Sequence, residues 1–180
     1  MGDERRYVWS ETLRNGLSVT IRPLRPDDRE RVATAVRELG QEAIYTRLFS
    51  HRRELTEAGL DRIMRVDATR EAALLVTRAQ GDDEIVIGSG RFMAPADDAM
   101  RAAEIAFVVE EDYQGLGIAG RLLRRLADVA RDKGVAEFEA DVLADNASML
   151  AVFARSGLPM RKRRDGGVVH VTLSLRTDPD

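Results

Sequence analysis

The sequence predicts one mixed α+β domain, with a mostly antiparallel central sheet flanked by helices. Three observations carry this prediction: β-rich runs separated by turn signals before residue 110, a long amphipathic helical pattern over 117–133, and an alternating strand pattern over 137–142. With 180 residues, 44% of them hydrophobic, the chain is long enough for one core and too short for two substantial domains. We expect an arm over 1–16, the domain over 17–176 and a tail over 177–180.

The first elements follow the turn signal Asn15-Gly16, which ends the expected arm. A run over 17–22 predicts the first strand. Pro26-Asp27-Asp28 then predicts the start of a helix, because proline fits a first turn and acidic side chains are favourable at the positive end of the helix dipole. We expect this helix to reach about Glu38 and to end at Gly40.

The middle of the chain predicts two short helices, a β-hairpin and a further strand. Thr56 is expected to cap the second helix, and Gly81-Asp82-Asp83 is expected to form the hairpin turn. The elements are a helix over 41–48, a helix from 56 with Leu60, Ile63 and Met64 at helical spacing, strands over 71–78, 84–91 and 102–109, and a loop over 95–100.

The last third predicts a β-α-β unit followed by a helix and a closing strand. Gly134 fits the C-terminal cap of the amphipathic helix, whose apolar residues are Ile118, Leu122, Leu126, Val129 and Ala130. Asp145 or Asn146 is expected to cap the next helix, and Gly157 to end it. Three residues of that helix are expected to face inward: Leu150, Phe153 and Ala154. The closing strand is expected over 168–175.

The most informative segment runs from Glu104 to Gly120, from an apolar strand through a glycine-broken turn into a helix. Glycines let the backbone approach a ligand closely, and the first N–H groups of the helix have no intrahelical partners. This combination binds anions, so the segment predicts a phosphate-bearing ligand.

Two other interpretations of this turn are weaker. Gly115 to Gly120 satisfies the dinucleotide pattern G-x-G-x-x-G, but five residues separate it from the strand, and the next strand has one polar face, with Glu137, Glu139 and Asp141. The glycines could also serve the geometry of the turn alone. We therefore expect a phosphate-bearing ligand other than NAD.

The run Gln114-Gly115-Leu116-Gly117-Ile118-Ala119 resembles the acyl-CoA pyrophosphate loop of the GNAT superfamily of N-acetyltransferases, written Arg or Gln, x, x, Gly, x, Gly or Ala. The resemblance extends over about 17–176. Within the superfamily, the stretches 44–49, 103–109 and 146–150 most resemble the catalytic domain of bacterial protein lysine acetyltransferases of the Pat type.

This resemblance implies a GNAT-like fold with a splayed strand, acetyl-CoA as the acyl-donor cosubstrate, and Glu104 as the general base. Backbone groups near 107–109 would hold the pantetheine arm and polarise the thioester carbonyl. The residues it implies as cofactor-binding are Phe107, Val108, Val109, Gln114, Gly115, Leu116, Gly117, Ile118, Ala119, Gly120, Arg121, Asn146 and Phe153.

Chemistry supports the need for a base, since a lysine amine with a reference pKa of ~10.4 is neutral in only about one molecule in a thousand at pH 7. Glu104 begins an apolar strand beside the glycine turn, where we expect partial burial to make the carboxylate a useful proton acceptor. Glu71, Asp141 or a chain of waters are the alternatives.

Asn146 and Phe153 each carry a qualification. Asn146 is a helix cap that could also reach the cofactor. Phe153 occupies the position where many superfamily members place a tyrosine that protonates the CoA thiolate, so no general acid is assigned. A thiol pKa near ~8.5 makes thiolate a fair leaving group without one. We expect Phe153 to pack against the end of the pantetheine arm.

Composition excludes several classes of function. The chain has no cysteine, and His51 and His170 are isolated, so we expect no disulfide and no metal site. No run is apolar enough to span a membrane, and the N-terminus lacks the core of a signal peptide, which predicts a soluble cytoplasmic protein. A net charge of −3 argues against nucleic acid as a partner.

Two basic runs, 161–164 and the group Arg121, Arg124 and Arg125, are either solvated surface or contacts for CoA phosphates. Taken together, the sequence predicts an acetyl-CoA-dependent N-acetyltransferase acting on a protein lysine, presented near 42–53 and the loop around Asp97. The alternatives are a small-molecule amine acceptor and a non-catalytic acyl-CoA sensor. Either a monomer or a homodimer is compatible with the sequence, and no fused regulatory domain is expected.

Overall fold

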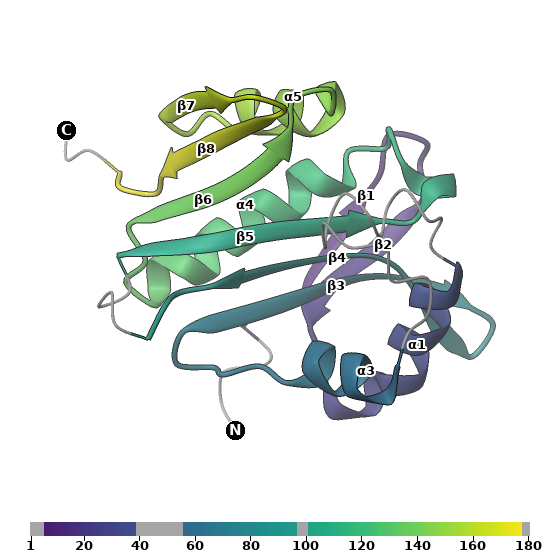
Figure 1. The fold of residues 1–180 in the computed structure, drawn as a ribbon. Coiled ribbons are helices and arrows are strands. Elements are labelled where there is room, and N and C mark those ends of the chain that lie inside the picture. The colour runs from purple at the N-terminus through teal and green to yellow at the C-terminus, as the bar shows by residue number, and fades with distance from the viewer. Residues whose placement is uncertain (1–5, 39–55, 97–100, 178–180) are drawn as a thin grey trace.

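A computed structural model describes residues 6–38, 56–96 and 101–177. Its strands form one open sheet in the order β1-β2-β3-β4-β5-β6-β8-β7 (Figure 1). Every neighbouring pair is antiparallel except β5 and β6, which are parallel. The predicted mixed sheet is confirmed. The strands are β1 Trp9–Thr12, β2 Ser18–Pro23, β3 Glu71–Gln80, β4 Asp83–Met93, β5 Ala102–Val109, β6 Glu137–Leu143, β7 Met160–Asp165 and β8 Val168–Ser174.

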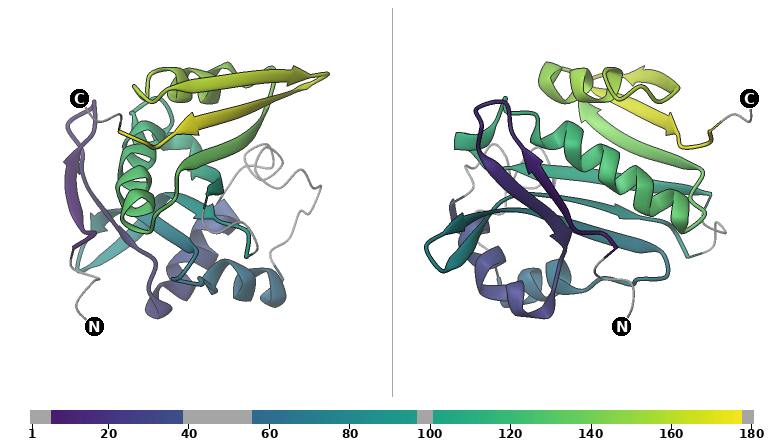
Figure 2. Two further views of the ribbon diagram at one scale, coloured as in Figure 1. Left: turned by 90° about the vertical axis from the view of Figure 1, so that its left-hand side faces the viewer. Right: turned by 180° about the vertical axis from the view of Figure 1, so that it is seen from behind.

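Helices cover both faces of this sheet. Helices α1 and α3 pack beside each other on one face, near β3 and β4, while α4 lies across the other face with α5 beside it (Figures 1 and 2). Short 3-10 turns precede α1 and follow β5. The helices are α1 Arg29–Glu38, α3 Glu57–Met64, α4 Ile118–Asp132 and α5 Ala147–Ala154, and the 3-10 turns are Pro26–Asp28 and Glu111–Tyr113.

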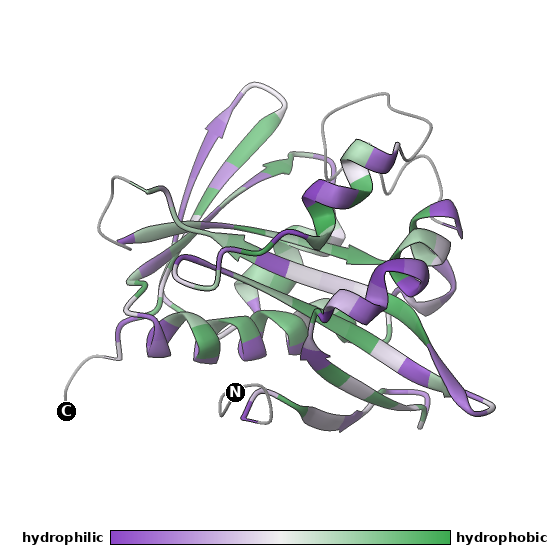
Figure 3. Cartoon of the chain, turned by 90° about the horizontal axis from the view of Figure 1, so that it is seen from below, coloured by the Kyte–Doolittle hydropathy of each residue, from purple (hydrophilic) through white to green (hydrophobic). Residues whose placement is uncertain are grey.

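The two faces have separate cores. The larger core lies between α4, α5 and the sheet, and its fully buried members include Phe92, Leu122, Leu126 and Phe138. The smaller one joins Val32 of α1 and Leu60 of α3 to Leu75 of β3. Figure 3 shows α4 with alternating hydrophilic and hydrophobic residues, as expected for a helix with one buried face.

Capping residues set the helix ends as predicted. The Thr56 hydroxyl accepts a hydrogen bond from the Gly59 N–H at 3.0 Å, and Asn146 accepts one from the Met149 N–H at 3.1 Å. Gly134 follows α4 with φ +85°, which favours glycine. The helix over 41–48, Gly40 and residues 97–100 of the predicted loop lie outside the described residues.

The sheet has two strands that the sequence patterns did not reveal. Trp9–Thr12 of the expected arm forms β1, which pairs with β2 and so belongs to the sheet. The basic run 161–164 lies in β7, an edge strand whose side chains are exposed from 161 onwards. Lysine and arginine protect an edge strand from pairing with other chains. These residues form solvated surface in the structure.

One predicted orientation in α5 is wrong. Ala154 was expected to face inward but is exposed, whereas Phe153 is fully buried. The buried face of the helix is centred on Phe153 and Met149, which packs against the larger core. A residue one position after Phe153 is turned by about 100° on a helix of 3.6 residues per turn, so Ala154 points away from the sheet.

A buried ion pair fixes the start of α1 against the sheet. The Arg22 guanidinium on β2 donates to both carboxylate oxygens of Asp28, at 2.8 and 2.7 Å, and also contacts Glu84. Asp28 is 0% and Arg22 3% exposed. Burial alone would raise the pKa of Asp28, but hydrogen bonds from Arg22 and the Arg25 backbone outweigh it and lower the pKa. The carboxylate is therefore charged in the folded protein.

Candidate active site and cofactor loop

The sheet opens between β5 and β6. These strands pair only at Ala102 to Glu104, opposite Glu137 to Glu139, while β5 continues to Val109 against β4. Beyond Glu104, the β6 side of β5 carries no ladder pairing to β6. This is the expected splayed strand, and it leaves backbone groups of 105–109 on that side available to a ligand.

The glycine turn lies at the open end of β5. After the 3-10 turn, Gly115 and Gly117 adopt φ +78° and +88°, and α4 starts at Ile118. Gly117 is the N-cap and offers no side chain, and the first turn of α4 contains no acidic residue. The free N–H groups and the positive end of the helix dipole are therefore directed at this turn without a competing carboxylate.

Two arginines hold the carbonyl groups of the turn. Arg14 donates to the Gly115 carbonyl at 3.4 Å, and Arg121 donates to the carbonyls of Leu116 and Gly117 at 3.4 and 3.1 Å. Arg121, predicted as a cofactor residue, thus contacts the loop itself. Nothing in the sequence pattern signalled Arg14, because its contact with Gly115 spans a sequence separation of 101.

A basic groove continues from the turn along α4. It encloses about 270 Å³ between α4 and α5, and it starts at Gly117 and Gly120. Among the described residues, no acidic side chain lines it. The arginines that line it are Arg14, Arg121, Arg124, Arg131 and Arg155.

Glu104 occupies the last paired position of β5 before the splay. Its neighbours across the sheet are Met93 on β4 and Glu139 on β6, both exposed, and Glu104 is exposed as well. The partial burial expected for this carboxylate is therefore wrong. It points to the face opposite α4, since Ala103 and Ile105 on either side of it are buried in the larger core.

The alternative bases are placed differently. Glu71 lies across Met93 from Glu104, but it is buried and accepts a hydrogen bond from the Asp67 N–H at 3.2 Å. Asp141 is exposed, and its carboxylate contacts the imidazole of His170 on β8.

The remaining predicted cofactor residues surround the splay and the turn. Gln114 donates to the Val109 carbonyl at 3.4 Å, which ties the turn to the end of β5. Phe153 is buried, with its ring centroid 6.2 Å from that of Phe107. Asn146 serves as the cap of α5.

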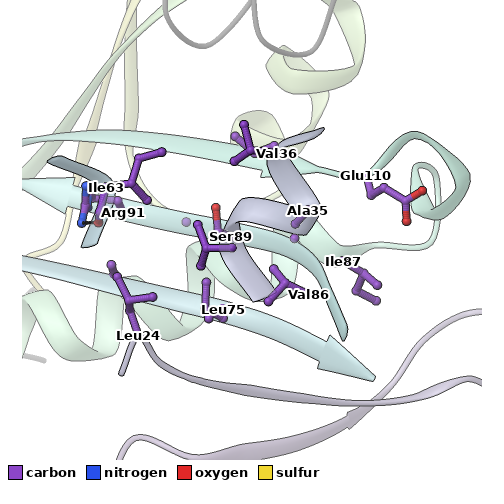
Figure 4. A pocket seen from close by; sticks show the side chains of 15 residues that line it. Leu24, Ala35, Val36, Ile63, Leu75, Val86, Ile87, Ser89, Arg91 and Glu110 are labelled. Carbon is purple, nitrogen blue, oxygen red and sulfur yellow. Dashed lines mark hydrogen bonds between the residues drawn. The ribbon is translucent and has the colours of Figure 1, made fainter. Parts of the chain in front are cut away.

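A second cavity lies on the face that carries Glu104, between α1, α3 and the sheet (Figure 4). It encloses about 60 Å³ and is largely apolar, with Arg91 at one end and Glu110 at the other. Burial lowers the pKa of Arg91 and raises the pKa of Glu110. Glu104 does not line this cavity. The sequence patterns did not predict this cavity. The signal that could have indicated it is the alternation of the polar residues Ser89 and Arg91 in a β-rich run.

Within residues 6–38, 56–96 and 101–177, no helix is both long and apolar enough to cross a membrane. The same residues contain no group of three or more histidine, cysteine or acidic side chains placed to hold a metal ion.

Comparison with known proteins places this geometry in a family. Residues 18–159 match the family model described as "Acetyltransferase (GNAT) domain". Acetyltransferase PA5475 of Pseudomonas aeruginosa is 32% identical over 141 residues, which are 78% of this chain and 75% of that protein. Acetyltransferase Pat of Mycolicibacterium smegmatis is 36% identical over 157 residues, which are 87% of this chain and 46% of Pat. The chain thus spans about half the length of that relative.

Solved structures agree. The GNAT domain of S. lividans PAT superposes with a TM-score of 0.83 at 28% identity, covering 94% of this chain and 97% of that one. The structure of yncA from Salmonella typhimurium with its cofactor acetyl-CoA superposes with a TM-score of 0.70 at 20% identity, covering 88% and 94%. The second likeness concerns the fold alone.

Proposed function

The chain belongs to the GNAT acetyltransferase family and is an acetyl-CoA-dependent acyltransferase, and from this premise we propose that it acetylates the side-chain amine of a protein lysine. The observation that carries the proposal is the exposed Glu104 carboxylate at the point where β5 and β6 separate. A base at this position is accessible to a side chain presented by another protein.

We assign the cofactor to the open end of β5. The pyrophosphate binds the N–H groups at 115–120, and the pantetheine arm follows the β5 backbone at Phe107, Val108 and Val109 toward Glu104. The 3′-phosphate binds in the arginine-lined groove between α4 and α5.

The chemistry then requires one proton acceptor. A lysine that arrives as an ammonium ion first loses one proton to water. Glu104 then takes a proton from the attacking amine as the nitrogen forms a bond to the thioester carbonyl carbon, and the C–S bond breaks to release CoA thiolate. Phe153 offers no proton to that thiolate, and a thiol pKa near ~8.5 makes this tolerable at neutral pH. Backbone N–H groups on the open side of β5 polarise the thioester carbonyl.

The surroundings of Glu104 favour a lysine. Met93, which is 45% exposed, stands beside it on β4 and offers an apolar surface for the methylene stem of the acceptor. We propose that the acceptor protein is presented near 42–53 and the loop around Asp97. Residues 42–53 and 97–100 lie outside the described residues, whereas 95 and 96 of that loop are described.

The cavity of Figure 4 favours a second candidate function, acetylation of a small-molecule amine. Its apolar walls and charged ends suit a metabolite, and it opens on the same sheet face as Glu104. A metabolite held there would have to extend beyond the cavity, because Glu104 is not among the lining residues.

One experiment decides between these acceptors. The purified chain and acetyl-CoA are added to a cognate lysate, newly acetylated lysines are mapped by mass spectrometry, and rates are compared with a panel of small amines. We expect acetylation at defined lysines of a few proteins. Small amines that react far faster than any protein would favour the metabolite alternative.

A further inference from the structure

The segment from Arg6 to Arg14, which contains β1, lies along the full length of α4 in the opposite direction. The Tyr7 hydroxyl donates a hydrogen bond to the Asp132 carboxylate near the C-terminal end of α4, at 2.9 Å. The Arg125 guanidinium carbon lies over the Trp9 ring, 5.0 Å from the ring centroid. Arg14 donates a hydrogen bond to the Gly115 carbonyl. Figure 2 shows the N-terminal edge of the sheet, which contains β1, beside α4. The expected arm thus touches the cofactor loop.

We propose that this segment positions the pyrophosphate loop, with Glu11 as the positioning residue that acts through Arg121. The inference rests on the proposed CoA site and adds residues to it that lie before the residues of the family match, which begin at 18. Glu11 is not among the described residues that line the groove, and its carboxylate contacts the guanidinium groups of Arg121 and Arg125.

Glu11 holds two arginines of α4. Its carboxylate accepts hydrogen bonds from Arg125 at 2.9 and 2.5 Å and lies 3.3 Å from the Arg121 Nε. The Glu11 side chain is 12% exposed and both arginine side chains are 22% exposed, so solvent screens these contacts only in part. The carboxylate therefore fixes where the Arg121 guanidinium can lie.

Arg121 in turn connects the segment to the loop. One of its terminal nitrogens donates to the Thr12 carbonyl on β1 at 2.8 Å, and the other donates to the carbonyls of Leu116 and Gly117. With Arg14 on Gly115, three consecutive carbonyls of the loop are held by guanidinium groups.

Holding the carbonyls directs the N–H groups. In a planar trans peptide the C=O and the following N–H point in opposite directions. Drawing the carbonyls of Gly115, Leu116 and Gly117 toward the arginines therefore turns the N–H groups of 116–118 away from them. Those N–H groups are the ones assigned to the pyrophosphate, so the contacts preorganise the anion site before CoA binds.

The competing explanation is that Arg121 contacts a CoA phosphate directly and that Glu11 merely restrains it. The two explanations predict opposite effects of Glu11→Gln. If Glu11 positions the loop, the variant weakens CoA binding. If Arg121 is a direct phosphate ligand, removing the neighbouring carboxylate leaves binding unchanged or strengthens it.

The test is calorimetric titration of CoA into the wild type, Glu11→Gln, Arg121→Lys and the control Asp132→Asn, with the KM for acetyl-CoA and kcat measured alongside. Asp132 ties the same segment to the other end of α4 through Tyr7 and Arg6. We expect the Kd for CoA and the KM to rise about tenfold in Glu11→Gln and in Arg121→Lys, while kcat stays within about twofold. Asp132→Asn should leave the Kd for CoA and the KM for acetyl-CoA within about twofold of the wild-type values.

Four results would overturn the inference. They are an unchanged or lower Kd in Glu11→Gln, full affinity in Arg121→Lys, an equal loss in Asp132→Asn, and a fall in kcat with no change in KM. If Glu11→Gln does not fold, Glu11→Asp decides in its place, because it keeps the charge but withdraws the carboxylate from Arg121: positioning predicts a raised Kd, and direct phosphate contact predicts an unchanged one. Failure of the wild type to bind CoA is a different outcome, since it contradicts the proposed cofactor site itself.

Discussion

Two arginine–carboxylate clusters tie the N-terminal residues to the rest of the molecule, and they differ in burial and in what they hold. The Arg22–Asp28 pair is at most 3% exposed and joins β2 to the start of α1. The Glu11 cluster is 12 to 22% exposed and joins β1 to the cofactor loop. The first fixes the fold on the face where we place the acceptor, and the second, in our proposal, fixes a backbone conformation on the face where we place the cofactor.

The difference in burial predicts different consequences of removing one partner. A deeply buried arginine that loses its carboxylate remains as an uncompensated charge, which destabilises the whole domain. An arginine near the surface can regain solvent, so loss of Glu11 should affect the loop more than the fold. Stability and cofactor affinity can therefore be changed separately.

The largest expected effect is on stability. Asp28→Ala should lower the free energy of unfolding by about 3–5 kcal/mol, because it removes both hydrogen bonds between the buried Arg22 guanidinium and Asp28 and leaves only the more exposed Glu84 as a charged partner. Urea denaturation followed by circular dichroism measures this. Asp83→Ala is the matched control, since Asp83 pairs with Arg31 at 2.8 Å at an exposed position, and its unfolding midpoint should barely move. Equal losses in both variants would show that burial is not what distinguishes the pairs.

The same pair predicts a pH dependence. The pKa of Asp28 is lowered in the folded state, so its contribution to stability is present above the unfolded pKa of ~3.9 and is lost as pH falls through the folded value. Wild-type stability should decrease on acidification below about pH 4. Asp28→Asn should show a flatter curve in that range, and an identical slope would contradict the assignment.

Turnover should respond most strongly at Glu104. Removing a positioned base typically costs ~10² to 10⁴ in rate, so Glu104→Gln should lower kcat at neutral pH at least about tenfold, with partial recovery at high pH as free amine becomes plentiful. CoA affinity should stay within about threefold, or ~0.65 kcal/mol. Glu139→Gln, the same change on the adjacent strand, is the control. Near wild-type turnover in Glu104→Gln would direct attention to Glu71 or Asp141.

Cofactor affinity should respond most at Gly117. A Cβ there would lie 2.5 Å from a terminal nitrogen of Arg121, and φ is +88°, so Gly117→Val should raise the Kd for CoA about tenfold by displacing Arg121 and straining the loop. Gly134→Val introduces similar strain, at φ +85°, at the other end of α4. That control should lose stability without losing CoA affinity, as measured by calorimetry.

The smallest effect is expected on the acceptor face. Met93→Ala removes apolar surface beside Glu104 and should raise the KM for a protein acceptor about threefold, with the KM for acetyl-CoA unchanged. Val8→Ala, which truncates another exposed apolar side chain, should change neither constant. Steady-state kinetics with an acceptor protein from the lysate screen would check both, and an unaltered acceptor KM in Met93→Ala would remove Met93 from the acceptor surface.

The sequence predicted the elements whose signals are local. The helix over 118–132, the strand over 102–109 and the caps at Thr56, Asn146 and Gly134 follow from periodicity and from residues within one turn of each end. Strand β1 was missed because four residues give too short an alternation to separate from an arm. Strand β7 was missed because its basic residues look like surface in any conformation.

The features missed at the site depend on contacts between distant residues. Arg14, Glu11 and Met93 acquire their roles through a hairpin that lies along α4 and through strand register, and neither is encoded in local spacing. The exposure of Glu104 has the same origin. An apolar strand suggested burial, but Glu104 points to the face opposite α4, away from the larger core that buries Ala103 and Ile105.

Cofactor binding and proton removal are assigned to opposite ends of β5, about 16 Å apart for the five residue steps from Glu104 to Val109. A double-mutant cycle tests this division most directly. kcat/KM for acetyl-CoA is measured for Glu104→Gln, Gly117→Val and the double variant. Independent sites predict that the two losses multiply, with a coupling energy within about 0.5 kcal/mol. A coupling energy above about 1 kcal/mol would show that the loop and the Glu104 carboxylate act as one unit. It would contradict the assignment of cofactor binding and proton removal to separate ends of β5.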